Sequence, residues 1–428
     1  MINRRQMLLN GAMLGVGAAA SFSGMTKASA QDARLRLYWW GTPDRAKRTQ
    51  DVAALFSKTH NGVTINAETA GADYWSKLTT MMAGGNLPDV FQLEPNSFAD
   101  YGRRKATLPL DSYFGQAIRT DRLASGALDL CKVDGQIFGI PIALNACAML
   151  YDKDVFARAD IAPPTATTTW EDFAKTCIQL TKFIGKDNVW AVGNCSHYNS
   201  MFTGWLGQRD KSMYTEDGKL GFTADDATEW YSYWQDLAKQ GGCTPAEVQS
   251  MDKSLVETNP LTTGNAVIAM TYSNLLPAYQ AVYKGPLEIT ATPIMNKTAP
   301  SGLFYRPALI WAISSQSKNP DIAAQFLDYF INDKEAGNIL GIERGVPVNL
   351  DIQQNITPAI DELAKKTVSY INDIADLVGP YPPQIPLGAT EFNTRAFIPI
   401  GLKLSYGNLT PSEAAAELIS QGKRILKS

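Results

Sequence analysis

Aromatic, charged and amide side chains follow two of the strands that the sequence predicts, in the stretches 39–45 and 92–94. They are Trp39, Trp40, Asp44, Arg45, Gln92 and Glu94. Aromatic rings can stack on the apolar faces of sugar rings, while charged and planar polar groups form the strong hydrogen bonds that offset desolvation of hydroxyls. This set of residue types is suited to binding a saccharide, although Trp39 could equally be core and Asp44 could cap the following helix.

Side chains for catalysis or for metal binding are sparse. The chain has two histidines and no Gly-x-Ser-x-Gly element. No cluster of His, Cys and carboxylates has the spacing of a metal site, so we expect neither a metal nor a cofactor. One alternative stays open, in which Glu94 and Asp44 form the carboxylate pair of an exported lyase or glycosidase. Iron binding by Tyr231 and Tyr233 is disfavoured because residues two apart on a helix point to different faces.

Strands and helices alternate in the first hundred residues. Residues 34–39, 63–67 and 88–93 have the apolar patterns of strands, and two amphipathic helices lie between them, one with Val52 and Phe56 on a face and one with Tyr74 and Leu78. This alternation predicts βαβ units and a parallel sheet. Ligands of such sheets gather at the carboxyl ends of the strands. Residues 39–45 and 92–96 are therefore expected at one rim.

Residues 133–156 mark the place where the chain changes sheets. The Asp134-Gly135 pair favours a tight hairpin turn. The following run to Leu150 is almost wholly apolar, and a proline within it is tolerated at a strand edge but not in a central ladder. We therefore expect residues 137–141 to end one sheet and residues 145–151 to begin another. Asn145 is polar within this run, which indicates either ligand contact or a role at the hinge.

Three stretches, in order, resemble the extracellular solute-binding proteins of ABC importers, in the carbohydrate-binding branch related to maltose-binding protein. They are Gly85-Asn86-Leu87-Pro88-Asp89-Val90, the segment from Asp134-Gly135 through Gly139-Ile140-Pro141 to Leu150-Tyr151-Asp152-Lys153-Asp154, and Thr169-Trp170-Glu171-Asp172-Phe173. The resemblance covers roughly residues 34–345. It implies an α/β fold of the periplasmic binding protein type II, with two lobes that close on a sugar about a hinge and deliver it to a membrane permease.

The resemblance also implies how the chain is shared between the lobes. Lobe 1 is expected to hold residues 31–142 and about 263–310, and lobe 2 to hold residues 143–262 and about 311–428. The expected partners are a saccharide, an oligosaccharide or an acidic sugar, and the transmembrane subunits of an ABC permease. We expect a soluble monomer that binds no nucleic acid and catalyses no reaction.

Further ligand-binding candidates lie in the second half of the chain. They are Tyr198, Trp205, Tyr272, Asn274, Gly302, Arg306 and Arg344. Trp205 is a candidate stacking platform, whereas Trp230 and Trp234, four apart on a helix, indicate core. Gly302 stands where many relatives have two glycines whose amides donate. Arg306 and Arg344 would suit an acidic sugar such as a uronate, or could form structural salt bridges.

The N-terminus has the pattern of an export signal. Arg4-Arg5 precedes an apolar stretch, Met7–Ala20, and Ala28-Ser29-Ala30 supplies a cleavage site. Residues 1–30 are therefore expected to be a twin-arginine-like signal peptide, which places the mature protein in a periplasm.

The net charge of the chain is −3, and three of its basic residues fall in the signal. An acidic chain with scattered charges argues against nucleic acid or anionic membrane as partner. None of the five cysteines forms a C-x-x-C pair.

Overall fold

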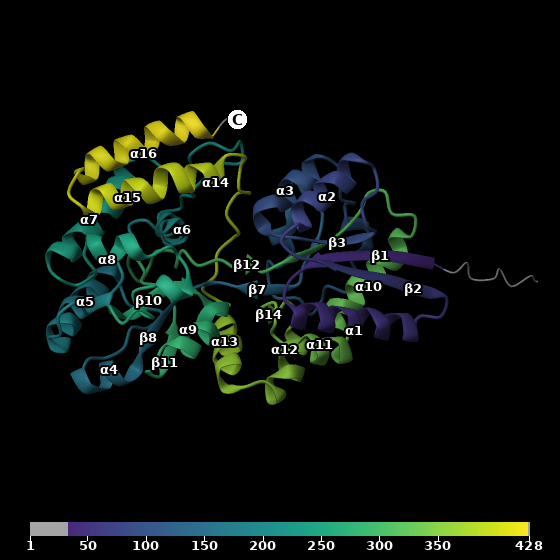
Figure 1. Cartoon of the computed structure of the whole chain (residues 1–428), viewed down its shortest axis with the longest axis horizontal. Coiled ribbons are helices and arrows are strands. Elements are labelled where there is room, and N and C mark those ends of the chain that lie inside the picture. The colour runs from purple at the N-terminus through teal and green to yellow at the C-terminus, as the bar shows by residue number, and fades with distance from the viewer. Residues whose placement is uncertain (1–32, 427–428) are drawn as a thin grey trace, which may run out of the picture.

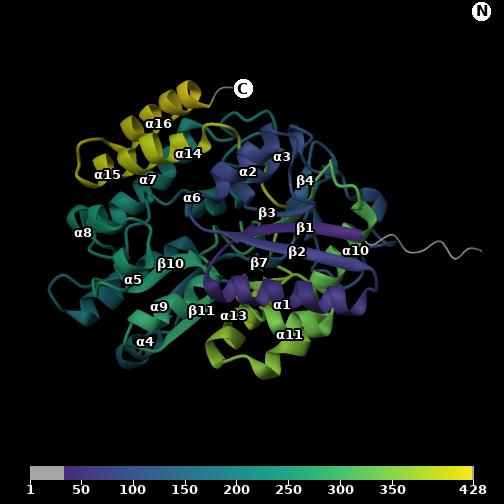
Figure 2. The same cartoon turned by 45° about the vertical axis from the view of Figure 1, so that its right-hand side comes forward.

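The computed structural model describes residues 33–426, and the predicted signal peptide lies outside this range. Two α/β lobes lie side by side and are joined by short crossing strands (Figures 1 and 2). Each lobe is built around its own sheet. The predicted fold class is confirmed by this architecture.

Lobe 1 contains a five-stranded sheet in the order β2-β1-β3-β13-β6. Its strands are β1 (Ala33–Trp40), β2 (Val63–Ala70), β3 (Val90–Leu93), β6 (Ile140–Pro141) and β13 (Ile310–Ile313). β1 is parallel to β2 and β3, as the sequence pattern predicts, while β13 is antiparallel to β3 and β6. The helices of this lobe are α1 (Pro43–Thr59), α2 (Tyr74–Ala83), α3 (Pro95–Arg103), α10 (Pro320–Asn332), α11 (Lys334–Leu340) and α12 (Leu350–Ile356).

Lobe 2 contains a four-stranded sheet in the order β11-β8-β10-β9. Its strands are β8 (Cys147–Asp152), β9 (Trp190–Val192), β10 (Ala266–Tyr272) and β11 (Leu287–Thr290). Its helices are α4 (Lys153–Ala159), α5 (Trp170–Ile184), α6 (Asn199–Gly207), α7 (Ala224–Lys239), α8 (Ala246–Met251), α9 (Leu276–Val282), α13 (Glu362–Asp373), α14 (Ala389–Phe392), α15 (Ile398–Ser405) and α16 (Pro411–Ile425). Trp230 and Trp234 are fully buried in its core, as predicted.

A three-stranded hinge sheet connects the lobes. β7 (Ala143–Asn145) lies between β12 (Arg306–Pro307) and β14 (Val346–Pro347), and all pairings are antiparallel. The chain thus leaves the sheet of lobe 1 at β6, crosses in β7 and enters the sheet of lobe 2 at β8. This is the change of sheets that the sequence predicts for residues 137–151.

The predicted division of the chain between the lobes is wrong after residue 262. β10 and β11 pair with β8, so residues 266–290 belong to lobe 2 and not to lobe 1. The chain returns to lobe 1 only through β12 and β13, and α10 to α12 stay there. It crosses again at β14, after which α13 packs on β11 and α9 of lobe 2. Hydrophobic pattern reports that a stretch is a buried strand, but it does not report which sheet the strand joins.

Local sequence signals account for several element boundaries. Asp134 and Gly135 have φ of 49° and 89°, which is the two-residue turn expected between β4 (Lys132–Val133) and β5 (Gln136–Ile137). Thr169 accepts a hydrogen bond from the backbone N–H of Asp172 at 3.1 Å and caps α5. The five cysteines are buried free thiols. Between residues 33 and 426, no helix combines the length and apolar character needed to span a bilayer.

Candidate functional site

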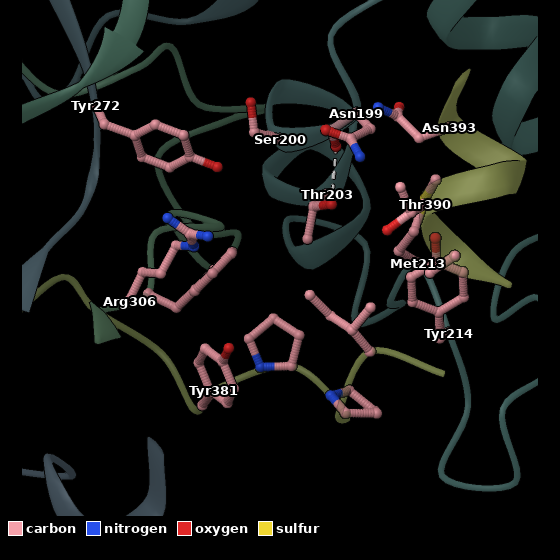
Figure 3. Close-up of a pocket in the computed structure, with 15 residues that line it drawn as sticks. Asn199, Ser200, Thr203, Met213, Tyr214, Tyr272, Arg306, Tyr381, Thr390 and Asn393 are labelled. Atoms are coloured by element: carbon pink, nitrogen blue, oxygen red, sulfur yellow. Dashed lines mark hydrogen bonds between the residues drawn. The ribbon is translucent and has the colours of Figure 1, made fainter. Parts of the chain in front are cut away.

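A cavity of about 330 Å³ opens on lobe 2 beside the hinge (Figure 3). It is lined by α6, the end of β10, the start of β12, a proline-rich segment and α14. The lining residues are Asn199, Ser200, Thr203, Met213, Tyr214, Tyr272, Phe304, Arg306, Tyr381, Pro382, Pro383, Ile385, Ala389, Thr390 and Asn393. Its volume is at the lower end of the range for small-molecule sites, and its combination of tyrosines with amides and hydroxyls suits a hydroxylated ring.

Tyr272 and Arg306 are the two predicted site residues that line this cavity. Arg306 is in β12, where it pairs with Asn145 of β7, so the hinge itself positions the guanidinium. Its Cζ lies 5.2 Å from the centre of the Tyr272 ring, within the range of a cation–π contact. Burial raises the pKa of Tyr272, so its hydroxyl stays protonated and able to donate at neutral pH. Ligand contact by both residues stays a prediction.

The first turn of α6 supplies polar groups to the opposite wall. Asn199, Ser200 and Thr203 face the cavity from this turn (Figure 3), and the Thr203 hydroxyl donates to the Asn199 carbonyl at 2.8 Å. Tyr198 immediately precedes the helix but points away, because its hydroxyl donates to the Asp252 carboxylate and its ring is held among buried groups. Tyr198 does not line this cavity, so its predicted ligand contact is not supported there.

The segment 379–388 forms the floor of the cavity. The backbone N–H of Gly379 donates to the Leu303 carbonyl at 2.8 Å, and the Gln384 amide donates to the Lys132 carbonyl of lobe 1 at 3.1 Å. The Tyr381 ring meets the Phe304 ring edge-on at 5.9 Å. Burial raises the pKa of Tyr381 to about 12. Tyr381, Pro382 and Pro383 also line two adjoining cavities of about 370 and 530 Å³, so this segment separates three cavities.

Lobe 1 presents an aromatic pair and a carboxylate at the carboxyl ends of β1 and β3. Trp40 is half-buried, and its ring lies 5.1 Å from that of Trp75 on α2. Glu94 follows β3 and is half-buried; burial raises its pKa, and the positive charge of Arg306 opposes that rise. Glu94 is therefore electrostatically coupled to the hinge arginine. This rim is where the strand alternation of lobe 1 predicts ligand groups.

Three other predicted residues of lobe 1 are internal. Trp39 is fully buried in the core, as its place in the alternation of β1 permits. The Gln92 side chain is fully buried and donates to the Trp40 carbonyl at 3.1 Å. Arg344 is 7% exposed and donates to the Thr49 hydroxyl at 2.7 Å and to Gln92 Oε1 at 3.3 Å. The predictions that these side chains contact a ligand are therefore corrected. They lie in the interior of lobe 1.

Asp44 and Arg45 are held by ion pairs. Asp44 is exposed on α1 and accepts from Arg48 at 2.8 Å, the spacing of an i,i+4 pair. Arg45 pairs with Glu343 at 2.8 Å and so ties α1 to the α11–β14 connection. Neither residue lines the cavity. Asp44, one member of the carboxylate pair that the enzyme alternative requires, is held at the surface by Arg48.

The remaining predicted residues do not line the cavity. Trp205 is 5% exposed and packs in an aromatic cluster, with its ring 5.1 Å from that of Trp170. Asn145 is buried, and Gly345 lies against its side chain oxygen at the hinge, which favours the hinge role. Asn274 is exposed and lines none of the three cavities. Gly302 has φ +73°, and a Cβ there would lie 2.1 Å from the Gly204 carbonyl oxygen.

Gly302 therefore lets α6 approach closely, and its backbone lines only the adjoining cavity of about 370 Å³. The expected role as an amide donor to ligand is not supported by this placement.

Sequence reasoning missed much of the cavity lining. The segment with Tyr381 has the composition of a surface connector, yet an aromatic residue among fixed-φ prolines is itself a signal of a rigid platform. Trp75, at the start of α2, was missed because the amphipathic pattern of that helix does not single it out.

Among residues 33–426, no group of three or more His, Cys, Asp or Glu is placed to hold a metal ion.

Comparison with known proteins agrees with this architecture. A solved extracellular solute-binding protein of family 1 from Alicyclobacillus acidocaldarius superimposes with a TM-score of 0.82 at 26% identity, covering 94% of this chain and 100% of that chain. A periplasmic oligogalacturonide binding protein from Yersinia enterocolitica gives a TM-score of 0.80 at 22% identity, covering 92% and 99%, which shows a shared fold.

Curated relatives match over shorter spans. An arabinooligosaccharide-binding protein of Halalkalibacterium halodurans is 24% identical over 196 residues, which is 46% of this chain and 40% of that protein. For other curated binding proteins the match spans 33% of their length. The family model described as bacterial extracellular solute-binding protein matches residues 51–367. The chain belongs to the family of bacterial extracellular solute-binding proteins.

Proposed function

We propose that this protein is the substrate-binding component of an ABC importer and that it binds a saccharide between its lobes. The observation that carries the proposal is the cavity beside β12, where tyrosines, hydroxyls and amides of lobe 2 meet the hinge. Trp40 and Glu94 stand at strand ends of lobe 1, and Trp75 of α2 packs beside Trp40. The saccharide names carried by relatives support the ligand class.

The mechanism follows from the hinge. Three crossings of two or three residues each join lobes that are otherwise separate sheets, so rotation requires changes at few backbone positions. Ligand held on lobe 2 gains contacts with the lobe 1 rim only when the lobes approach. Binding therefore shifts the population toward the closed form, which the transmembrane subunits of the permease would recognise.

We infer in addition that the chain is exported. The Arg4-Arg5 leader supports passage through a twin-arginine route into a periplasm, where the protein would act as a monomer without catalysis. Family membership supports export, and the family members compared above are binding proteins.

The test is a thermal-shift and calorimetric screen of residues 31–428 against neutral and acidic mono- and oligosaccharides. A ligand that binds the folded state alone stabilises it by roughly 2.7 kcal/mol at a hundredfold excess over Kd. We expect a rise in Tm with one saccharide class and no product after prolonged incubation. No rise with any saccharide would refute the proposal, and product formation would favour the enzyme alternative.

A variant pair ties the binding to the cavity. Y381A removes an aromatic wall, and loss of one stacking contact of about 1 kcal/mol predicts a roughly fivefold weaker affinity. Y406A removes a tyrosine that is half exposed and lines none of the three cavities. Its affinity should equal that of the wild type. Equal affinities of Y381A and wild type would place the ligand elsewhere.

A further inference from the structure

Arg306 has no anionic partner at the cavity. The guanidinium forms no hydrogen bond or ion pair with the residues that the structure describes, and it makes a cation–π contact with the Tyr272 ring. The other two arginines predicted at the site are satisfied: Arg45 pairs with Glu343, and Arg344 is buried on Thr49 and Gln92. Arg306 is thus the charged group whose donors remain available to a ligand.

The rest of the cavity lining carries no charge. Besides Arg306 it consists of amides, hydroxyls, tyrosines, prolines and apolar side chains, with no Asp or Glu among them. A neutral sugar offers many hydroxyl donors, which carboxylates accept best. Here the strong acceptors are absent from the wall and a strong donor is present. This lining therefore suits a ligand that itself carries a strong hydrogen-bond acceptor.

The position of Arg306 adds a geometric reason. Enclosing a guanidinium without an anion costs free energy, because its hydration is lost and not replaced. Closure of the lobes would enclose Arg306, since it lies in a hinge strand between lobe 2 and the Glu94 rim. The planar fork of arginine matches a carboxylate through two parallel hydrogen bonds. A ligand carboxylate would therefore be most valuable in the closed form.

We propose that Arg306 binds the carboxylate of an acidic saccharide, such as a uronic acid or a short chain of uronates, and that the protein takes acid sugars in preference to neutral ones. This inference rests on the proposed saccharide binding and names its substrate class. Tyr272, Tyr381 and Tyr214 supply ring contacts and hydroxyls around the anchored sugar. Glu94 is not in the cavity lining and remains across the hinge.

The experiment compares a carboxylate with its neutral ester on one sugar skeleton. Galacturonate and glucuronate, as mono-, di- and trisaccharides, are titrated against the matching methyl esters by calorimetry at one ionic strength. A hydrogen-bonded charge pair predicts that the acid binds roughly 10- to 100-fold more tightly than the ester. R306M should abolish this preference, and R306K, which keeps the charge but not the fork, should retain part of it.

The control variant is R395M. Arg395 follows the cavity residue Asn393 in sequence but is exposed, pairs with Glu391 at 3.0 Å and does not line the cavity. Its acid-to-ester preference should equal that of the wild type. Equal binding of acid and ester by wild type, or an equal loss for both in R306M, would overturn the role of Arg306 while leaving saccharide binding intact. Binding of neither acid nor ester, together with no neutral sugar, would instead overturn the proposed function.

Discussion

His197 provides a test of how burial on lobe 2 controls stability. It lies between β9 and α6, is 3% exposed, and its Nδ1 is 2.7 Å from Gln249 Nε2. Burial, reinforced by the nearby charge of Lys253, lowers the pKa of His197 from 6.5 to about 4. A solvent-exposed histidine would have a pKa near 6.5, so the titration tests the burial of His197 directly.

The sign follows from proton uptake. Below pH 6.5 the unfolded chain protonates His197 while the folded chain does not, so the free energy of unfolding falls as the pH falls. The contribution of His197 to the free energy of unfolding is fully present above about pH 6.5. It decreases as the pH falls, and the decrease ends below the folded pKa of about 4. Linkage predicts a loss of about 2 kcal/mol between pH 7 and pH 5, and of about 3 kcal/mol by pH 4.

The assay is urea unfolding of wild type, H197Q and H60Q at several pH values from 7 to 4. Asp252, whose pKa is raised by burial, is present in all three proteins, so the difference between the curves isolates the histidine. H197Q should lack the loss assigned to His197. H60Q removes the other histidine, which lies at the end of α1, and should follow the wild type. Parallel curves for wild type and H197Q would refute the reasoning.

Two substitutions test the packing behind the site. G302A should lower the free energy of unfolding by well over 1 kcal/mol, because the left-handed φ alone costs about that much and the new Cβ would meet the Gly204 carbonyl at 2.1 Å. Gly126 has a similar φ, but its Cβ would enter open space. In the same urea titration, G126A should therefore show only the cost of the left-handed backbone. T49V should cost about 1–3 kcal/mol, because it leaves a buried donor of Arg344 without its 2.7 Å partner. T80V, on an exposed face of α2, is the control. An equal loss of stability in T49V and T80V would show that Arg344 does not depend on its hydrogen bond to Thr49.

Elements and the crossing at residues 137–151 could be predicted from the sequence because their signals are local. Period-two alternation located β1, the Asp134-Gly135 pair located a hairpin, and Thr169 located the start of α5. The allotment of β10 and β11 to a lobe could not be predicted this way. Both are buried apolar strands, and the partner of a buried strand is decided by long-range pairing, here with β8.

The candidate site was predicted at the level of rims more than of side chains. Strand ends pointed to Trp40 and Glu94, whose ligand contact stays a prediction, while Trp39 and Gln92 on the same ends turn into the core. Trp39 and Trp40 differ in which face of the sheet their side chains take, which a one-residue shift reverses, whereas Glu94 lies just beyond the end of β3. Arg344 is a further case, since a guanidinium near a cleft and one buried behind it have the same sequence signature. Tyr381 lay in a segment whose prolines carry no periodicity.

The order of strands in lobe 1 has a consequence for how the chain is made. β13 lies between β3 and β6 in the sheet, yet it is separated from β6 by all of the first part of lobe 2. A nascent chain therefore holds β3 with one edge unpaired until residue 313 has been synthesised, while lobe 2 awaits α13 to α16. Lobe 1 is complete only once α12 has been made, by which time most of lobe 2 has already been synthesised. Non-local pairing of this kind slows folding and leaves partly built sheets exposed to wrong partners, so the interval before β13 arrives is when this protein most needs protection from aggregation.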